Sequence, residues 1–345
     1  MSGKIAVAGA SGLVGANIVK AALARGYTVH GGMRTVAGPD EHLMALPGAS
    51  ARLTLSAADM DTAGAFDPVV AGADGVFIAS LIPVYSAPDG TPARQLDDAR
   101  GWAEIIQPTV DGCLNIMRSA IAAGAKTIVI CSSTSSTNPV PPVAVKNEVD
   151  HWSDPEQQCR EKKYTSATKA VMERAAMALA GEHGVRLCIL LPTGMHGPMV
   201  LPKHGEEGFM GAIARMLRGE KGRHDQAPND STSMAHIEDV AALFLAAYEN
   251  PQAEGRYYAL RESWHWNDIY RCLREIEPSL HIPPLYEGEQ AVPTQFDFTR
   301  RAAWACKCAI SRKSWRKRSP GRRQVSSASI SRFAQSMKSC RSANT

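Results

Sequence analysis

A tyrosine and a lysine stand close together in the stretch REKKYTSATKAVMERAA, residues 160–176. A phenol has an ordinary pKa of about 10, so it exchanges protons near neutral pH only with a cation beside it. Tyr164 and Lys169 could form such a pair, but they are five residues apart and diverge by roughly 140° on a regular helix. Thr165 stands four residues before Lys169 and shares its face. An alcohol is too weak an acid to replace a phenol directly.

Three arrangements of these residues are open. Tyr164 could lie at or before the helix N-cap and swing toward Lys169, or a bulge in the first turn could bring it there. Otherwise the phenol is absent from the site, and Thr165 relays a proton through water. A helix that follows DPEQQCREKK begins near this point. We therefore expect Tyr164, placed before the first helical turn, to be the proton donor beside Lys169, and Thr165 to be a bystander.

A glycine-rich loop follows the first apolar run and precedes a helical pattern, as GASGLVG over residues 9–15. Glycines allow a tight turn and a close approach of backbone N–H groups to a pyrophosphate, and the helix N-terminus favours the negative charge. The pattern predicts a dinucleotide site made by Gly9, Ser11, Gly12, Leu13, Val14 and Gly15.

The end of the second predicted strand bears on the choice of cofactor. An acidic residue there would accept from the ribose of NAD, but the sequence is GGMRT, with Arg34 and no carboxylate before Asp40. A guanidinium suits the 2′-phosphate of NADP. We expect NADP(H), with NAD the less favoured cofactor, and adenine-edge contacts from Asp59 and Met60.

Short β-branched runs alternate with helical stretches through the first 190 residues, which predicts a Rossmann-type, doubly wound parallel α/β sheet. The expected strands are 4–10, 27–33, 51–57, 75–80, 126–133 and 186–192, and the expected helices 13–25, 103–124 (entered around Pro108) and 165–183. Beyond Pro192 we expect helices 209–219, 234–251 and 266–278 and a strand 255–260. These predict a cofactor domain over 1–192 and a smaller C-terminal substrate lobe over 193–303, with some chain returning to the first domain.

Charge is divided unevenly along the chain. Residues 300–345 hold 13 Lys/Arg and no Asp/Glu, which leaves 25 basic and 34 acidic side chains in residues 1–299. The acidic body argues against nucleic-acid binding. No apolar run approaches the ~20 residues that span a bilayer. The N-terminus enters a strand pattern at once, so we expect a cytoplasmic protein, monomer or homodimer. The scattered cysteines predict reduced thiols that pack, and no metal site.

The segment from about Trp304 to Thr345 has neither strand alternation nor a helical stripe. Its Arg/Ser-rich composition is typical of disorder, or of a basic arm. A shift of reading frame is the favoured explanation, because GC-rich codons read one nucleotide over can give an acidic amphipathic helix such as LGVQMRDIPEVLEEALAW.

Several motifs together resemble the extended short-chain dehydrogenases/reductases of the NAD-dependent epimerase/dehydratase superfamily, in particular the dihydroflavonol reductase and cinnamoyl-CoA reductase branch. The motifs are GASGLVG, MRT, DGVFIAS, IQPTVDGCLNIMRSA, IVICSSTSST, LLPTGMHGP and MAHIEDVAALFLAAYENPQAEGRYYAL, in that order and covering residues 3 to about 300. The chain departs from this family where a tyrosine should stand four residues before the lysine, which puts the proton donor in doubt.

The resemblance implies hydride transfer between a nicotinamide and a carbonyl or alcohol carbon. It implies that Ser133 hydrogen-bonds the carbonyl oxygen, that Lys169 holds the nicotinamide ribose, and that the cofactor is also touched by Ala79, Ser80, Pro192, Thr193 and Gly194. We expect reduction of the aldehyde or ketone of a medium-sized, partly apolar small molecule, held by residues 80–85, 193–202 and 204–209 with His196 and His204. The alternatives are a redox-inert cofactor-binding regulator and a nucleotide-sugar epimerase or dehydratase. His236, Trp264 and Trp266 are expected to be structural.

Overall fold

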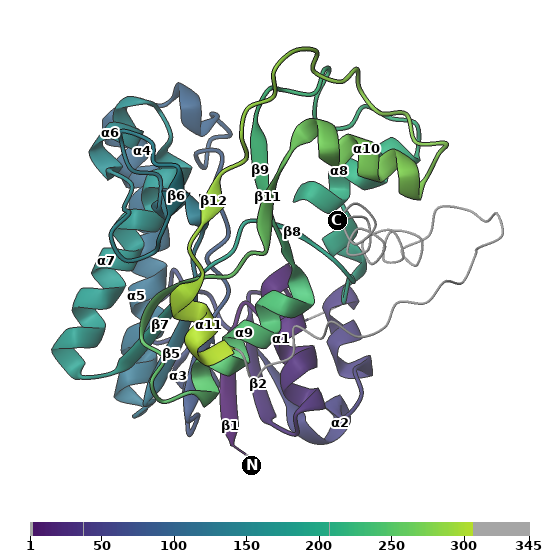
Figure 1. The fold of residues 1–345 in the computed structure, drawn as a ribbon. Helices are drawn as coiled ribbons and strands as arrows, with labels where there is room; N and C mark the ends of the chain where they lie inside the picture. The colour runs from purple at the N-terminus through teal and green to yellow at the C-terminus, as the bar shows by residue number, and fades with distance from the viewer. Residues whose placement is uncertain (1–2, 37, 207, 306–345) are drawn as a thin grey trace.

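Seven parallel strands form the main sheet of the protein, in a computed structural model that describes residues 3–36, 38–206 and 208–305 (Figure 1). Their order is β10-β7-β5-β4-β1-β2-β3, and every neighbouring pair is parallel. The bounds are β1 (Lys4–Ala8), β2 (Thr28–Met33), β3 (Leu53–Ala57), β4 (Gly75–Ile78), β5 (Thr127–Cys131), β7 (Arg186–Leu191) and β10 (Gly255–Tyr258). The strand order reverses between β1 and β4, which is where open α/β sheets bind ligands. The predicted fold class is confirmed.

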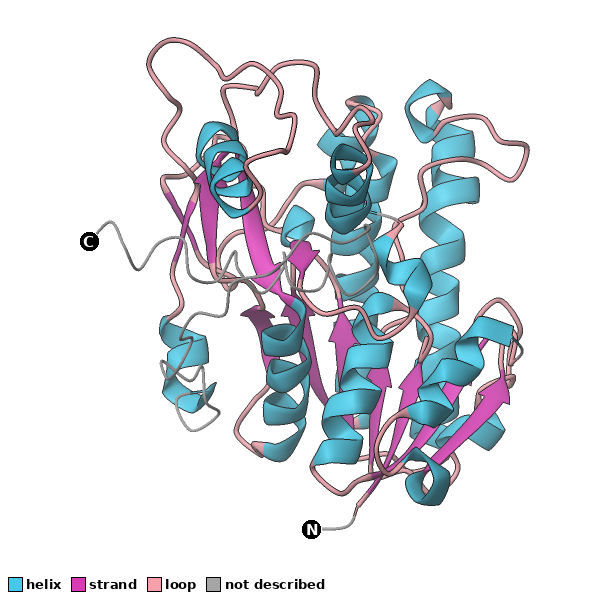
Figure 2. Cartoon of the chain, turned by 90° about the vertical axis from the view of Figure 1, so that its right-hand side faces the viewer, coloured by secondary structure: helices cyan, strands magenta, loops and turns pink. Residues whose placement is uncertain are grey.

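Helices cover both faces of this sheet (Figures 1 and 2). On one face α1 (Leu13–Ala24) packs against α9 (Ile237–Glu249), and on the other α5 (Gln107–Ala122) packs against α7 (Tyr164–His183). Central strands between two helical layers are mostly apolar, and all five residues of β5 are buried. The shorter helices are α2 (Ala49–Arg52), α3 (Asp67–Val70), α4 (Asp98–Gly101) and α6 (Pro155–Arg160). The described cysteines are free thiols, as predicted, and four of the five are buried.

The helix that leads into α5 begins earlier than the sequence predicts. Asp97 caps α4 by accepting from the N–H of Arg100 at 2.8 Å, and a π-helical turn, η3 (Trp102–Ile106), joins α4 to α5. A π-turn inserts one residue into a helix and often lies at a functional site. This turn packs against α7.

A smaller lobe lies above the carboxyl ends of the strands (Figure 2). It holds a three-stranded sheet, in the order β11 (Glu262–His265), β9 (Ser231–His236), β8 (Gly194–His196), with helices α8 (Gly208–Leu217) and α10 (Trp266–Ile276). Trp264 and Trp266 are buried in its core, as expected. The helix predicted from residue 234 begins only at Ile237, because residues 234–236 belong to β9 and pair with β8, and Met234 pairs with β11 as well.

Part of the chain beyond Pro192 returns to the main sheet. Strand β10 pairs with β7 as its outer neighbour, and α9 lies in the helical layer beside α1. A two-stranded pairing of β6 (Val145–Lys146) with β12 (Gln295–Phe296) and the helix α11 (Thr299–Ala305) complete the described chain. The interpretation of the C-terminal segment concerns mainly residues 306–345, which lie outside the described residues. No helix in the described ranges is long and apolar enough to cross a membrane.

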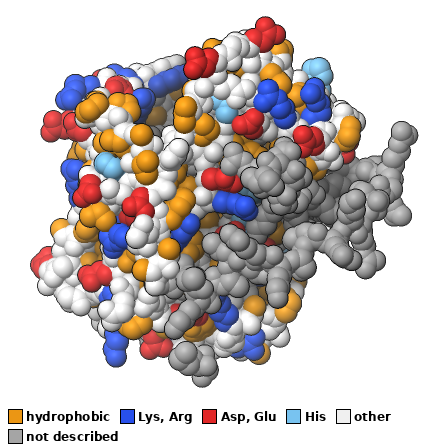
Figure 3. Space-filling view, viewed as in Figure 1, with side chains coloured by type: hydrophobic (Ala, Val, Ile, Leu, Met, Phe, Trp, Pro, Cys, Tyr) orange, Lys and Arg blue, Asp and Glu red, His pale blue; other side chains and the backbone are white. Residues whose placement is uncertain are grey.

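Acidic and basic side chains are interspersed on the face shown in Figure 3. Exposed ion pairs of the described chain include Arg100–Asp89 at 2.7 Å and Lys162–Asp98 at 2.7 Å. Exposed pairs of this kind contribute about 0–1 kcal/mol each, so they say little about the stability of the fold.

Candidate active site

The glycine loop between β1 and α1 has the geometry of a phosphate cradle. Gly9 has a left-handed φ of +79°, and a Cβ built on it would lie 2.6 Å from the Cα of Ser80. A Cβ on Gly15 would collide with the Gly9 carbonyl oxygen. Gly12 occupies the N-cap of α1 and offers no side chain to its first-turn N–H groups. The helix N-terminus is therefore left to an external acceptor.

Ser80 faces this cradle from the loop after β4. Its hydroxyl oxygen is buried and has no hydrogen-bond partner in the described chain. A buried polar atom without a partner is costly, so it indicates an acceptor or water that completes the site when a ligand is bound. A pyrophosphate at the α1 N-terminus fits both features. Ala79, just before it, is buried, and its N–H donates to the Ala8 carbonyl at 2.9 Å.

The residues expected to bind the adenosine end lie after β2 and β3. Arg34 directly follows Met33 at the carboxyl end of β2 and is exposed. Asp59 is exposed and accepts from the N–H of Asp61 at 3.1 Å. Met60 is fixed against α5, where its carbonyl accepts from the Asn115 side chain at 3.0 Å.

One face of α7 carries three polar residues at intervals of four, Thr165, Lys169 and Glu173, which we call the α7 stripe. The Thr165 hydroxyl donates to the Val84 carbonyl. The Lys169 ammonium, which is 3% exposed, donates to the Leu81 carbonyl at 2.6 Å. Glu173 accepts from the Ser132 hydroxyl. The stripe therefore faces the loops that leave β4 and β5, at the edge of the sheet where the glycine loop lies.

Burial lowers the pKa of Lys169, and the nearby Cys131 and Glu173 oppose that shift. A buried ammonium with one carbonyl partner still has two N–H groups to donate. This suits the ribose hydroxyls that the family resemblance assigns to it.

Tyr164 is the first residue of α7, and its hydroxyl lies away from the stripe. The ring is fully buried and packs on Gly101, where an added Cβ would clash with it. The hydroxyl donates to Oδ1 of Asp98 at 2.6 Å and accepts from the Lys162 ammonium at 3.0 Å. Burial and the Asp98 carboxylate raise the pKa of Tyr164, although Lys162 opposes them. A catalytic phenol needs the opposite shift.

This packing counts against the expectation that Tyr164 swings toward Lys169. Lys163 is the N-cap of α7, so Tyr164 already lies within the first turn and follows the helical rule of about 100° per residue. Thr165 fills the position four residues before Lys169.

Ser132 and Ser133 follow β5 but have different roles. The Ser132 hydroxyl is engaged by Glu173. Ser133 is the N-cap of the turn η4 (Thr134–Ser136), and its Oγ accepts from the Ser135 N–H at 3.2 Å. Because the Ser133 hydroxyl oxygen accepts this bond, the hydroxyl can still donate its own hydrogen to another acceptor.

The chain after β7 joins residues 132–137, which we call the serine loop, to the smaller lobe. The Pro192 carbonyl accepts from the N–H of Thr134 at 3.0 Å. Thr193 is half-buried, and Gly194 begins β8. His204 reaches the glycine loop, where its Nε2 lies 3.0 Å from the Ser11 carbonyl. The smaller lobe therefore contacts the cradle itself.

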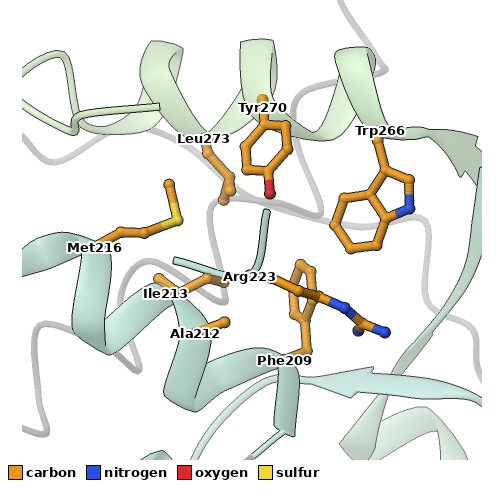
Figure 4. Close-up of a pocket in the computed structure, with 8 residues that line it drawn as sticks. All are labelled: Phe209, Ala212, Ile213, Met216, Arg223, Trp266, Tyr270 and Leu273. Carbon is orange, nitrogen blue, oxygen red and sulfur yellow. The ribbon is translucent and has the colours of Figure 1, made fainter. Parts of the chain in front are cut away.

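A pocket lies inside the smaller lobe between α8 and α10 (Figure 4). Only Phe209 comes from the segments expected to hold the substrate. His196 and His236 are instead buried against each other, with ring centroids 5.5 Å apart. The pocket is lined by Phe209, Ala212, Ile213, Met216, Arg223, Trp266, Tyr270 and Leu273.

Sequence reasoning missed three residues of this region, Asp98, Glu173 and Arg256. Glu173 alone had a local signal, since it stands four residues after Lys169. Asp98 and Arg256 are brought in by the fold from positions 66 and 83 residues away from their partners. Across the described ranges, no group of three or more His, Cys, Asp or Glu side chains could hold a metal ion.

Comparison with known families decides the classification. The NAD dependent epimerase/dehydratase family matches residues 5–260. The chain belongs to this family. Within it, the chain is 31% identical to dihydroflavonol 4-reductase from Hordeum vulgare, over 83% of this chain and 78% of that protein. It is also 31% identical to a cinnamoyl-CoA reductase from Medicago truncatula, over 81% and 82% of the two chains. The resemblance to this reductase branch is confirmed.

Solved structures show the same fold. Vestitone reductase from alfalfa (Medicago sativa) superimposes with a TM-score of 0.70 at 23% identity, over 88% of this chain and 92% of that one. A yeast methylglyoxal/isovaleraldehyde reductase complexed with NADPH gives a TM-score of 0.69 at 17% identity, over 97% of this chain and 98% of that one.

Proposed function

We propose that the protein is an NADPH-dependent reductase that converts the carbonyl group of a medium-sized, partly apolar aldehyde or ketone to an alcohol. The observation that carries the proposal is the α7 stripe, which presents Thr165 and Lys169 to the loop after β4 beside the phosphate cradle. The similarity of the chain to reductases named for dihydroflavonols and cinnamoyl-CoA supports the reaction class.

The cofactor would lie along the carboxyl edge of the sheet. Gly9, Gly12 and Gly15 would accommodate the pyrophosphate, Ser80 would gain a partner, and Lys169 would donate to the nicotinamide ribose. Bound NADPH would supply the hydride that reduces the carbonyl carbon. Arg34, exposed after the end of β2, would meet a 2′-phosphate, so we expect NADP to be preferred over NAD.

Protonation of the product oxygen is where this chain departs from its relatives' branch. Ser133 would donate to the carbonyl oxygen and stabilise the charge that develops there. We propose that a water molecule held by Thr165 passes a proton to the product oxygen and is itself reprotonated from solvent, because Tyr164 is committed to Asp98 and Lys162. The Thr165 hydroxyl donates to Val84, so its oxygen can still accept from such a water.

A second candidate is a cofactor-binding protein without turnover, and the buried Tyr164 favours it. A reductase in which a water replaces the phenol would be slow, since a positioned acid contributes about 10²–10⁴-fold to rate.

Fluorescence titration of the purified protein with NADPH and NADH, followed by a turnover screen over aldehydes and ketones, separates these candidates. NADPH binding with turnover on any carbonyl compound supports the reductase. Binding without turnover across the screen supports the second candidate, and absence of binding by either dinucleotide would overturn both.

A further inference from the structure

Beneath the proposed catalytic serine lies a buried ion pair that the reaction itself does not use. Arg256 of β10 donates from Nε to Oε2 of Glu173 on α7 at 2.8 Å, and the two side chains are 3% and 0% exposed. A buried pair often adds little stability, because desolvation of both charges offsets their attraction. The position of this pair therefore calls for another explanation.

Arg256 has five N–H donors, and all five have acceptors. Beside Glu173, Nη1 donates to the carbonyls of Glu148 at 2.9 Å and His151 at 3.2 Å. Nη2 donates to the carbonyl of Ser136 at 3.2 Å and to its hydroxyl oxygen at 3.0 Å. The guanidinium also stacks on Trp152, 3.5 Å from the ring centroid. A lysine could not reproduce this planar fork.

The two members of the pair hold the two ends of the serine loop. Glu173 accepts from the hydroxyl of Ser132, at the beginning of the loop. Arg256 binds Ser136 at its end, and the Ser136 hydroxyl in turn donates to the Ser133 carbonyl at 2.9 Å. Ser133 therefore lies between two anchors that are charged, buried and bonded to each other.

We propose that Glu173 and Arg256 are positioning residues that fix the Ser133 hydroxyl for the carbonyl oxygen of the substrate. Glu173 belongs to the α7 stripe, so one helix face sets both the ammonium of Lys169 and the loop that carries Ser133. The inference rests on the proposed function, in which Ser133 touches the substrate.

Two neighbouring serines of the serine loop allow a conservative test of this positioning role, one as the test variant and the other as its matched control. Ser136→Ala removes the hydroxyl bridge from Arg256 to the Ser133 carbonyl without stranding a charge, and the backbone of residue 136 still bonds to both. Ser135→Ala removes a neighbouring hydroxyl of the same turn, while its backbone N–H still donates to Ser133. Both variants are compared with the parent for NADPH affinity, thermal unfolding, and kcat and KM on the carbonyl compound that turns over fastest.

We expect Ser136→Ala to lower kcat about tenfold with NADPH affinity nearly unchanged, and Ser135→Ala to match the parent. Ser133→Ala should lower kcat at least as much. The double variant Ser133→Ala/Ser136→Ala should be no slower than Ser133→Ala, because positioning acts only through the hydroxyl that is already gone. Additive losses would overturn the inference, and so would an unchanged kcat in Ser136→Ala.

A silent Ser133→Ala would instead overturn the proposed role of that serine, which keeps the two failures distinct. Hydrogen exchange supplies a readout that needs no turnover. The backbone amides of residues 132–137 should exchange faster in Ser136→Ala and Arg256→Lys than in Ser135→Ala, each corrected for global stability. Equal protection in the three variants would show that the ion pair does not hold the loop.

Discussion

The Tyr164 hydroxyl lies 2.6 Å from Oδ1 of Asp98, and this bond holds the start of α7 against α4. Thr165, one residue later, faces the loop after β4 instead. The two neighbours therefore have different surroundings, and the proposal that Thr165 and not Tyr164 serves the reaction is open to direct test.

Tyr164→Phe and Thr165→Val should have opposite effects. Loss of the Tyr164 hydroxyl leaves Asp98 with Lys162 alone, so we expect a loss of about 1–2 kcal/mol in the free energy of unfolding and little change in turnover. Loss of the Thr165 hydroxyl removes the group that holds the proposed water, so turnover should fall by roughly 10²-fold with NADPH binding intact. Urea unfolding and steady-state kinetics measure both. A crippled Tyr164→Phe of normal stability would restore the phenol as the donor.

Arg34→Ala tests the choice of cofactor. A charge-assisted contact to the 2′-phosphate is worth about 1.5–3 kcal/mol, so NADP(H) affinity should fall roughly 10- to 100-fold while NAD(H) affinity stays almost constant. Isothermal titration with both dinucleotides measures this. Equal affinities of the parent protein for NAD and NADP would remove the argument.

Gly9→Ala should abolish dinucleotide binding. Gly124 provides a matched control, because both glycines have φ of +79° but a Cβ on Gly124 meets no atom within 4 Å, whereas one on Gly9 meets the Ser80 backbone. Each substitution costs about 1–2 kcal/mol of left-handed strain. Gly124→Ala should therefore lose stability and keep NADPH binding, and Gly9→Ala should lose both. If the two variants bind NADPH equally, the cradle is not the phosphate site.

Acid should destabilise the fold through the imidazole of His224. Its Nδ1 lies 2.9 Å from the Tyr270 hydroxyl beside the pocket, and burial followed by the charge of Arg223 lowers the pKa of His224 below 6.5. Below about pH 6.5 the unfolded chain therefore binds more protons than the folded chain does. The free energy of unfolding decreases as the pH is lowered. Unfolding at pH 7.5 and pH 5 should show a smaller difference in His224→Asn than in the parent.

His30 contributes to the same acid dependence, since burial and Lys4 lower its pKa as well. The double variant with His30→Asn should flatten the profile further. An unchanged pH dependence in both variants would exclude these imidazoles as its source.

The sheet was predictable because its signals are local. The run KIAVA followed by GASGLVG marks a buried strand, a turn and a helix start within twelve residues. Strands β8 and β11 escaped prediction because three or four residues are too few to show alternation, and residues 234–236 share their apolar character with the helix that follows. These short strands are set by pairing with β9 and not by their own sequence.

The site was predictable only where one segment carries it. The position of Thr165 four residues before Lys169 on one helix face could be read from spacing, and Ser133 could be placed after a strand, while their roles stay predictions. The orientation of Tyr164 could not, because it depends on Asp98, on Gly101 and on a π-turn that adds a residue to a distant helix. One residue changes the direction of a helical side chain by about 100°, so a correct helix with a start uncertain by one residue leaves the chemistry undecided.

Strand β10 has a consequence for synthesis of the protein on the ribosome. Glu173 is translated 83 residues before Arg256. Until β10 emerges, the carboxylate has no guanidinium to offset its burial, and the edge of β7 has no neighbour to pair with its backbone groups. A nascent chain of about 250 residues therefore contains the glycine loop, Ser133 and Lys169 but lacks Arg256, and we expect a fragment that stops before codon 256 to be prone to aggregation.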